Sequence, residues 1–150
     1  MELKIALIND CFAKMFEKNE THTFHLVQPC DNEAVVVVTR QTAKTAGFSP
    51  TDEFMIAVAA SELATNILRY AGEGLITVST IHNDGHYGIE IIALDEGPGI
   101  EDINLAMTEG FTTTKKSLGM GLPSVKKIMD EFIIISHPGM GTCVISRKWS

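Results

Sequence analysis

Alternating apolar and polar positions, together with β-branched composition, predict strands in several parts of the chain. The predicted strands are Thr21–Val27, Leu75–His82, Tyr87–Leu94, Phe132–Ser136 and Thr142–Lys148. Asp84-Gly85 joins the second strand to the third and is typical of a two-residue hairpin turn. A turn over 137–141, which contains Pro and Gly, joins the last two strands into another hairpin. The apolar run from Ile89 to Leu94 indicates a strand near the centre of a sheet.

The segment after the first strand carries two opposing signals. Asp31 is a candidate cap for a helix that runs to Ala46, with Gly47 as its stop. The β-branched run Val35–Val38 favours a strand instead. We predict the helix, because the cap, the stop and the Ala, Gln, Lys and Arg content agree.

A second helix has a clearer beginning. Ser49 is the expected cap, Pro50 suits the first helical position, and Asp52 can return the capping hydrogen bond. This helix is expected to run to about Ala71, with Gly72 ending it.

Shorter helices are predicted at Glu101–Met107 and Gly121–Asp130, with Thr108–Leu118 between them as a loop. Residues 2–18 have rough helical spacing, and we treat 1–20 as an N-terminal extension of a domain spanning 21–150. The order of elements predicts an α+β two-layer sandwich, with helices on one face of a mixed, mostly antiparallel sheet.

Composition narrows the function classes. The 150 residues carry a net charge of −7, which argues against nucleic-acid binding because phosphate contacts require a basic surface. The chain has no run of about 18 apolar residues, so no membrane span is expected. Its three cysteines share no metal-ligand spacing and indicate reduced thiols in a cytoplasmic protein.

Glu62 and Asn66 lie one helical turn apart on the predicted 50–71 helix. The Asn side-chain oxygen can ligate Mg²⁺ while phosphates supply further ligands, and Glu62 can accept a proton from a hydroxyl or water aimed at a γ-phosphate. The same spacing is also common in solvated polar pairs of amphipathic helices.

Asp95 ends a predicted buried strand and precedes a glycine turn over 96–100. A carboxylate there can accept a hydrogen bond from an exocyclic amine, and glycines at 97 and 99 allow the backbone to approach a flat ring. An ordinary turn explains the same residues.

Gly119-Met120-Gly121 joins the threonine-rich loop to the predicted 121–130 helix. Backbone amides at a helix N-terminus bind phosphate, and Thr112 and Thr113 can add hydroxyl donors. A plain helix start is the alternative. The pattern matches neither a P-loop nor a dinucleotide-binding fingerprint.

Taken together, these segments resemble the GHKL (Bergerat-fold) ATPases and kinases over about residues 20–148. Ser61–Asn66 looks like their N-box, Asp95–Ile100 their first glycine box, Leu118–Leu122 the second, and Gly141-Thr142 the distal glycine-threonine box. Within that superfamily, the chain resembles the anti-sigma-factor serine/threonine kinases, in particular the RsbT-type switch kinases of bacterial stressosomes.

The resemblance implies a role for each matching residue. Glu62 is implied as the general base, Asn66 as the magnesium ligand, and Asp95 as the residue that recognises the adenine amine. The full set of expected nucleotide-binding residues is Asn66, Asp95, Gly97, Gly99, Ile100, Thr112, Thr113, Leu118, Gly119, Met120, Gly121, Leu122 and Thr142. The implied cofactors are ATP and Mg²⁺.

The resemblance further implies a protein-serine/threonine kinase that phosphorylates a STAS-domain antagonist and switches partners in bacterial stress signalling. A PP2C-type phosphatase or a sigma factor is the implied second partner. The alternative is an anti-sigma factor or non-catalytic ATP-binding module that sequesters a sigma subunit, because both groups share the nucleotide site.

Overall fold

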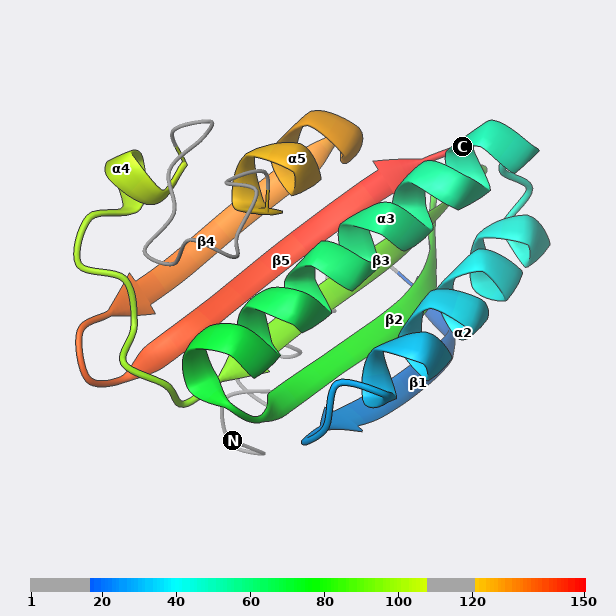
Figure 1. Ribbon diagram of the computed structural model, residues 1–150. Helices are drawn as coiled ribbons and strands as arrows, with labels where there is room; N and C mark the ends of the chain where they lie inside the picture. Colours follow the sequence, from blue (N-terminus) through cyan, green and yellow to red (C-terminus); the bar gives the residue numbers. More distant parts are fainter. Residues whose placement is uncertain (1–16, 108–120) are drawn as a thin grey trace.

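A five-stranded sheet, covered by helices on one face, forms the framework of the computed structural model, which describes residues 17–107 and 121–150 (Figure 1). The strands run in the order β1-β2-β3-β5-β4, and each pairs antiparallel with its neighbour. Their bounds are β1 (Glu17–Leu26), β2 (Gly74–Asn83), β3 (His86–Asp95), β4 (Glu131–His137) and β5 (Gly141–Trp149). The predicted α+β sandwich is therefore confirmed, and no parallel pair occurs in the described part of the chain.

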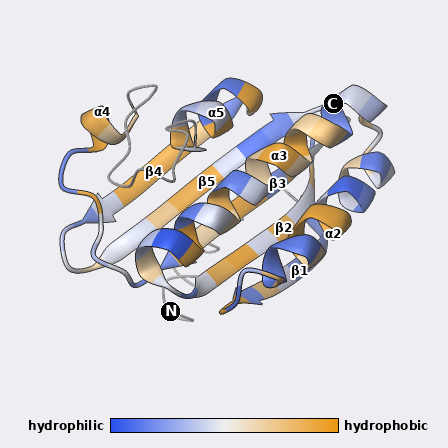
Figure 2. Cartoon of the chain, in the orientation of Figure 1, coloured by the Kyte–Doolittle hydropathy of each residue, from blue (hydrophilic) through white to orange (hydrophobic). Residues whose placement is uncertain are grey.

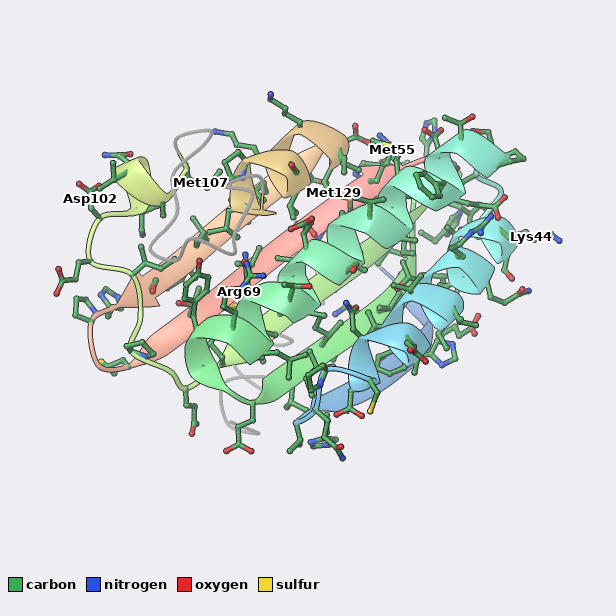
Figure 3. The ribbon with its side chains drawn as sticks, in the orientation of Figure 1. Lys44, Met55, Arg69, Asp102, Met107 and Met129 are labelled. Atoms are coloured by element: carbon green, nitrogen blue, oxygen red, sulfur yellow. The ribbon has the colours of Figure 1, made fainter. Side chains whose placement is uncertain are left out.

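The helical layer lies over the sheet face that is turned toward the viewer in Figure 1. Its elements are α2 (Asp31–Thr45), α3 (Pro50–Asn66), the π-helical turn η1 (Ile67–Ala71), α4 (Ile103–Ala106) and α5 (Gly121–Ile128). Asp102 lies at one end of this layer and Lys44 at the other (Figure 3). Asp102 also lines a cavity of the molecule.

Alternation along the strands produces the core. Ile76, Val78, Ile89 and Ile91 face the helices and are fully buried with the small residues of α3. Short alanine side chains on α3 let this helix lie close to the strands. Figure 2 shows apolar and polar residues alternating along strands such as β2 and along the helices α2 and α3.

A separate apolar cluster lies on the opposite face of the sheet. It contains Leu75, Ile92, Leu94, Cys143 and Ile145. Buried charges flank this cluster on the same face, where Arg147 Nε lies 2.8 Å from a Glu90 carboxylate oxygen and Lys18 Nζ lies 2.7 Å from the other. Paired opposite charges are the arrangement in which buried ions are tolerated.

The predicted turn and cap signals are largely confirmed. Asp84 and Gly85 have φ values of 48° and 82°, as a tight hairpin turn with two left-handed residues requires. Ser49 Oγ accepts a hydrogen bond from Asp52 N at 3.2 Å and caps α3. Gly47, with φ 92°, follows α2 as the predicted stop.

The capping role predicted for Asp31 is wrong. Asp31 is the first residue of α2, and its Oδ2 accepts hydrogen bonds from Val27 N and Gln28 N, each at 2.9 Å. The carboxylate therefore closes the turn between β1 and α2 rather than the first turn of the helix. These two backbone donors hold the pKa of Asp31 below its ordinary value.

Several element bounds also differ from the prediction. β1 begins at Glu17 rather than Thr21, so the helix expected over 2–18 is wrong at its last two residues, and residues 1–16 lie outside the described part. The short helix at 101–107 is reduced to α4, and α5 ends at Ile128 rather than Asp130. The loop predicted over 108–118 also lies outside the described residues.

Asp31→Ala should remove a pH-dependent contribution to stability. A carboxyl group with a lowered native pKa stabilises the fold at pH values above its unfolded pKa of about 3.9, and this contribution disappears as pH falls through the native pKa. The free energy of unfolding, measured with urea between pH 2 and 7, should therefore differ most between wild type and variant above about pH 4.

Asp31→Asn is the matched control, because it keeps a side-chain oxygen acceptor but does not titrate. Its difference from Asp31→Ala should not change with pH in this range. A wild-type advantage over Asp31→Ala that stays constant down to pH 2 would contradict the assignment.

Candidate functional site

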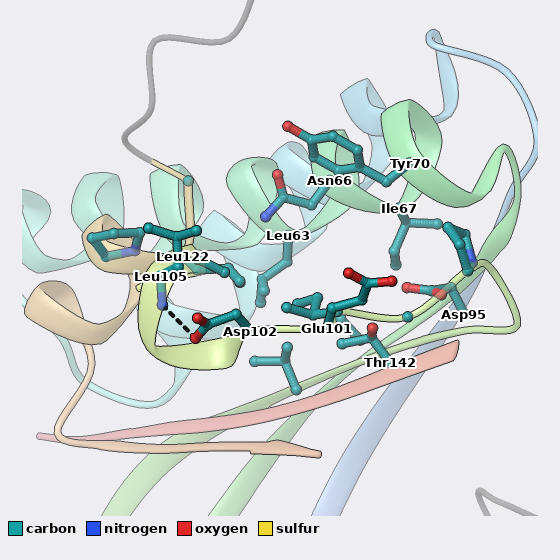
Figure 4. Close-up of a pocket in the computed structure, with 18 residues that line it drawn as sticks. Leu63, Asn66, Ile67, Tyr70, Asp95, Glu101, Asp102, Leu105, Leu122 and Thr142 are labelled. Atoms are coloured by element: carbon teal, nitrogen blue, oxygen red, sulfur yellow. Dashed lines mark hydrogen bonds between the residues drawn. The ribbon is translucent and has the colours of Figure 1, made fainter. Parts of the chain in front are cut away.

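A cavity of about 520 Å³ lies between the helical layer and the ends of β3 and β5 (Figure 4). This volume is within the range of about 300–1,000 Å³ that is usual for small-molecule sites. The residues that line it are Leu63, Asn66, Ile67, Tyr70, Ala93, Asp95, Pro98, Gly99, Ile100, Glu101, Asp102, Leu105, Ala106, Gly121, Leu122, Pro123, Thr142 and Val144. Most of the wall is apolar, and a few polar side chains enter it from different elements.

One end of the cavity is formed where α3 and α5 meet. Asn66 is the last residue of α3, and Gly121 is the first residue of α5. A Cβ atom at position 121 would lie 3.1 Å from both amide atoms of the Asn66 side chain. Glycine therefore allows the beginning of α5 to approach Asn66 closely.

A change of helix type follows Asn66 directly. Residues Ile67–Ala71 form a π-helical turn, which Gly72 closes by donating from its N to Ile67 O at 3.0 Å. Such turns are rare and occur frequently at functional sites. Both Ile67 and Tyr70 of this turn line the cavity.

The opposite end of the cavity is formed by paired strand residues. Asp95 on β3 and Thr142 on β5 are direct cross-strand partners, and both line the cavity. Asp95 Oδ1 accepts a hydrogen bond from Gly97 N at 2.9 Å, which fixes the orientation of the carboxylate. In Figure 4, Asp95 and Thr142 lie on the strand side and Asn66 on the helix side.

Two backbone turns are locked together at this end. Gly99 and Gly141 have φ values of 76° and 95°, and a Cβ on either one would clash with a carbonyl oxygen, that of His137 or of Asp95 respectively. Gly139 N donates to Pro98 O at 2.7 Å, so the turns also share a backbone hydrogen bond. Only glycine fits at positions 99 and 141.

Ser136 is a residue of this end that the sequence reasoning missed. Its buried Oγ lies 2.8 Å from Ile100 N, 3.1 Å from Gly141 O and 2.8 Å from Thr142 Oγ1. The signal that indicates it is the register of the last hairpin, because a turn over 137–141 pairs position 136 with Thr142. Tyr70 was missed as well, although it follows Asn66 by four residues along the helical segment.

Acidic side chains lie at the mouth of the cavity. Glu101 and Asp102 are exposed and line it. Asp102 Oδ1 accepts a hydrogen bond from Leu105 N at 3.0 Å and caps α4, as the dashed line in Figure 4 shows. In the described ranges, no group of three or more His, Cys, Asp or Glu side chains is arranged to hold a metal ion.

Most of the predicted nucleotide-binding residues that the structure describes come together around this one cavity. These are Asn66, Asp95, Gly99, Ile100, Gly121, Leu122 and Thr142. Gly97 does not line the cavity, because it packs against Ala71, where a Cβ would come within 2.6 Å of the alanine Cβ. The remaining predictions lie outside the described residues, namely Thr112, Thr113, Leu118, Gly119 and Met120.

Glu62, the predicted general base, is half-buried on α3, one turn before Asn66. It does not line the cavity. Its neighbour Ser61 accepts a hydrogen bond from Asn32 Nδ2 at 3.0 Å, which ties this part of α3 to α2. None of the helices that the structure describes is long and apolar enough to span a membrane.

Sequence relatives carry two kinds of name. The chain is 42% identical to "Serine/threonine-protein kinase RsbT" of Bacillus subtilis (strain 168) over 131 residues, which is 87% of this chain and 98% of the relative. It is 40% identical to "Anti-sigma F factor" of Caldanaerobacter subterraneus subsp. tengcongensis over 99 residues, which is 63% of this chain and 68% of that protein.

Solved structures share the fold at low sequence identity. One is a chain of the SiaB-SiaC complex from Pseudomonas aeruginosa, with a TM-score of 0.53 and 11% identity, covering 97% of this chain and 98% of that one. Another is full-length ShkA in complex with AMPPNP, with a TM-score of 0.52 and 17% identity, covering 97% of this chain and 35% of that one.

The family model "Histidine kinase-like ATPase domain" matches residues 29–148, a range that contains every described residue lining the cavity. The resemblance predicted from the sequence motifs is therefore confirmed, and the chain belongs to the family of histidine kinase-like ATPase domains.

Proposed function

We propose that this protein is an ATP-dependent serine/threonine protein kinase whose nucleotide site is the cavity between α3, α5 and the ends of β3 and β5. One observation carries the proposal: Asn66 beside Gly121, and Asp95 beside Thr142, form the two ends of a single apolar cavity. A purine nucleoside triphosphate matches these two ends, because it has a flat base at one end and an anionic, metal-binding triphosphate at the other.

The strand end of the cavity suits the adenine base. Asp95 can accept a hydrogen bond from the exocyclic amine, while the interlocked turns at Gly99 and Gly141 keep the backbone close to a flat ring. Apolar side chains such as Ile67 and Val144 provide surface on which the ring can be buried.

The helix end suits a magnesium-bound triphosphate. Asn66 offers a neutral oxygen ligand, and the backbone amides at the beginning of α5 lie directly beside it. The remaining ligands of Mg²⁺ would be phosphate and water oxygens, which commonly complete its coordination in nucleotide sites.

Glu62 is proposed as the general base. A base must reach the hydroxyl of the acceptor rather than the nucleotide itself, so a position on α3 next to Asn66 and outside the cavity lining is compatible with this role. The acceptor serine or threonine would then approach along this side of α3.

The proposed partners are those that the resemblance to the RsbT-type kinases implies. A relative named serine/threonine kinase that is matched over nearly its whole length favours a kinase, which we assign to residues 21–150. We propose a STAS-domain antagonist as substrate, a PP2C-type phosphatase or a sigma factor as the second partner, and the cytoplasm as the location. The second candidate function is sequestration of a sigma factor, which the relatives named anti-sigma F factor favour.

The proposal predicts transfer of labelled phosphate from ATP to a STAS-domain protein encoded in the same genome. Glu62→Gln should lower the rate of this transfer about 100-fold, because a positioned base is lost. Calorimetry should show ATP affinity nearly unchanged, since Glu62 does not line the cavity.

Glu73→Gln is the matched control for this experiment. Glu73 is an exposed acid just beyond η1 that does not line the cavity, so its replacement should leave the transfer rate unaltered. Transfer at the wild-type rate by Glu62→Gln would show that the base has been assigned wrongly. Tight sigma-factor binding without any transfer by wild type would favour sequestration.

Asn66→Ala should weaken ATP binding only where it depends on magnesium. We expect a loss of at least about tenfold in affinity with Mg²⁺ present, since even changes beyond the direct ligands cost this much metal affinity. Calorimetry with Mg²⁺ and with EDTA measures the difference. Asn32→Ala on α2 is the control, because Asn32 binds Ser61 outside the cavity. An equal loss under both conditions would exclude Asn66 as a metal ligand.

Asp95→Asn should reduce the preference for ATP over GTP. The amide can keep the oxygen that accepts from Gly97 N, but it replaces the other acceptor with a donor. We expect a fall in ATP affinity of about tenfold or more, as for the loss of a hydrogen bond to a charged group. Competition of both nucleotides with a fluorescent analogue measures the ratio, and an unchanged ratio would argue against recognition of the base by Asp95.

A further inference from the structure

The hydroxyl group of Ser136 makes three polar contacts but has only one proton to donate. Ser136 is 8% exposed at the end of β4, and its Oγ contacts Ile100 N, Gly141 O and Thr142 Oγ1 at 2.8, 3.1 and 2.8 Å. All three distances are within the range of hydrogen bonds. A serine hydroxyl has one proton to donate and two lone pairs to accept with.

Only one assignment of donors and acceptors makes all three contacts of Ser136 Oγ hydrogen bonds. Ile100 N can only donate, so Ser136 accepts from it. Gly141 O can only accept, so the serine proton goes to that carbonyl oxygen. Thr142 must then donate its own proton to Ser136 Oγ. If Ser136 instead donated its proton to Thr142 Oγ1, the oxygen atoms of Ser136 Oγ and Gly141 O would face each other without a proton between them.

This assignment determines what Thr142 presents to the cavity. Its proton points toward Ser136, so its lone pairs remain for a ligand. The cross-strand partner of Thr142 is Asp95, whose carboxylate also accepts hydrogen bonds. Two acceptors on adjacent strands match an amino group with its two N–H bonds, and they repel a carbonyl oxygen.

We infer that Ser136 is a positioning residue that orients the Thr142 hydroxyl as an acceptor and so selects a base that carries an exocyclic amine. This inference rests on the proposed nucleotide site. It concerns the polarity of one hydroxyl group within that site, which neither the sequence motifs nor the family assignment specifies.

Three nucleotides test the inference. They are ATP, purine riboside triphosphate, which lacks the amine, and 1-deaza-ATP, which keeps the amine but lacks the ring nitrogen beside it. Calorimetry should show that wild type prefers ATP over purine riboside triphosphate. In Ser136→Ala, this preference should fall roughly three- to tenfold, because the Thr142 proton is released and can turn into the cavity. The affinity for ATP relative to 1-deaza-ATP should not fall, because both nucleotides keep the amine.

Two variants separate positioning from support of the fold. Ser136→Thr keeps the hydroxyl group and should retain the preference for the amine. Ser146→Ala is the matched control, since Ser146 is a fully buried serine of β5 that donates to Ile91 O at 3.3 Å and does not line the cavity. It should leave both nucleotide ratios as in wild type.

Thr142→Val provides an independent reading if Ser136→Ala does not fold. It should lose the same preference. Where Ser136→Ala does fold, combining it with Thr142→Val should cause no further loss. Retention of the preference in Thr142→Val would overturn the inference.

The remaining outcomes are distinct. An equal loss for all three nucleotides in Ser136→Ala would reduce Ser136 to structural support and overturn the inference. A loss of affinity for ATP and purine riboside triphosphate that spares 1-deaza-ATP would mean that Thr142 donates to the ring nitrogen, which also overturns it. Failure of wild type to bind ATP would remove the proposed function together with the inference. If wild type binds ATP but the nucleotide preferences of Ser136→Ala equal those of wild type, the inference is wrong and the proposed function stands.

Discussion

The close approach of two backbone turns is the constraint on which the site depends. Asp95 and Thr142 are cross-strand partners at the ends of β3 and β5, and the turns beside them pack with no side chain between them, at Gly99 and Gly141. Both glycines also have positive φ values, which other residues rarely adopt. A side chain at either position would separate the turns and, with them, the two polar groups that face the cavity. The glycines at 99 and 141 are therefore needed both for the local turns and for the position of Asp95.

The other end of the cavity depends on a second close approach, of a different kind. Gly121 lies against the Asn66 amide, but the elements that carry these residues are helices that meet through packing rather than through a shared backbone ladder. The strand end is held by sheet hydrogen bonds along β3 and β5. The two ends of the cavity are therefore held by different interactions, a backbone ladder at the strand end and side-chain packing at the helix end.

Much of the fold could be predicted from local signals, and the failures share a physical cause. The hairpin at Asp84, the Ser49 cap and the strand positions each follow from a few neighbouring residues, and each is confirmed. Asp31 was misassigned because its carboxylate binds backbone donors on its N-terminal side, an alternative that spacing alone does not exclude. The π turn after Asn66 could not be foreseen, since its residues suit an α-helix equally well. The register of the last hairpin indicates the contact of Ser136 with Thr142, but its contact with Ile100, which is distant in sequence, could not be predicted.

The position of Glu62 bears on how one helix can serve two binding events. Asn66 enters the cavity, whereas Glu62, one turn earlier on the same helix, does not line it. In the proposed reaction, the nucleotide and the acceptor protein would therefore contact α3 at successive turns, with the phosphate between them. The change to a π turn directly after Asn66 ends the regular α-helix at the residue that enters the cavity. A displacement of α3 by either ligand would also change the position of this helix at the other binding site. In the proposed reaction, nucleotide binding and acceptor binding would therefore be coupled through a single helix.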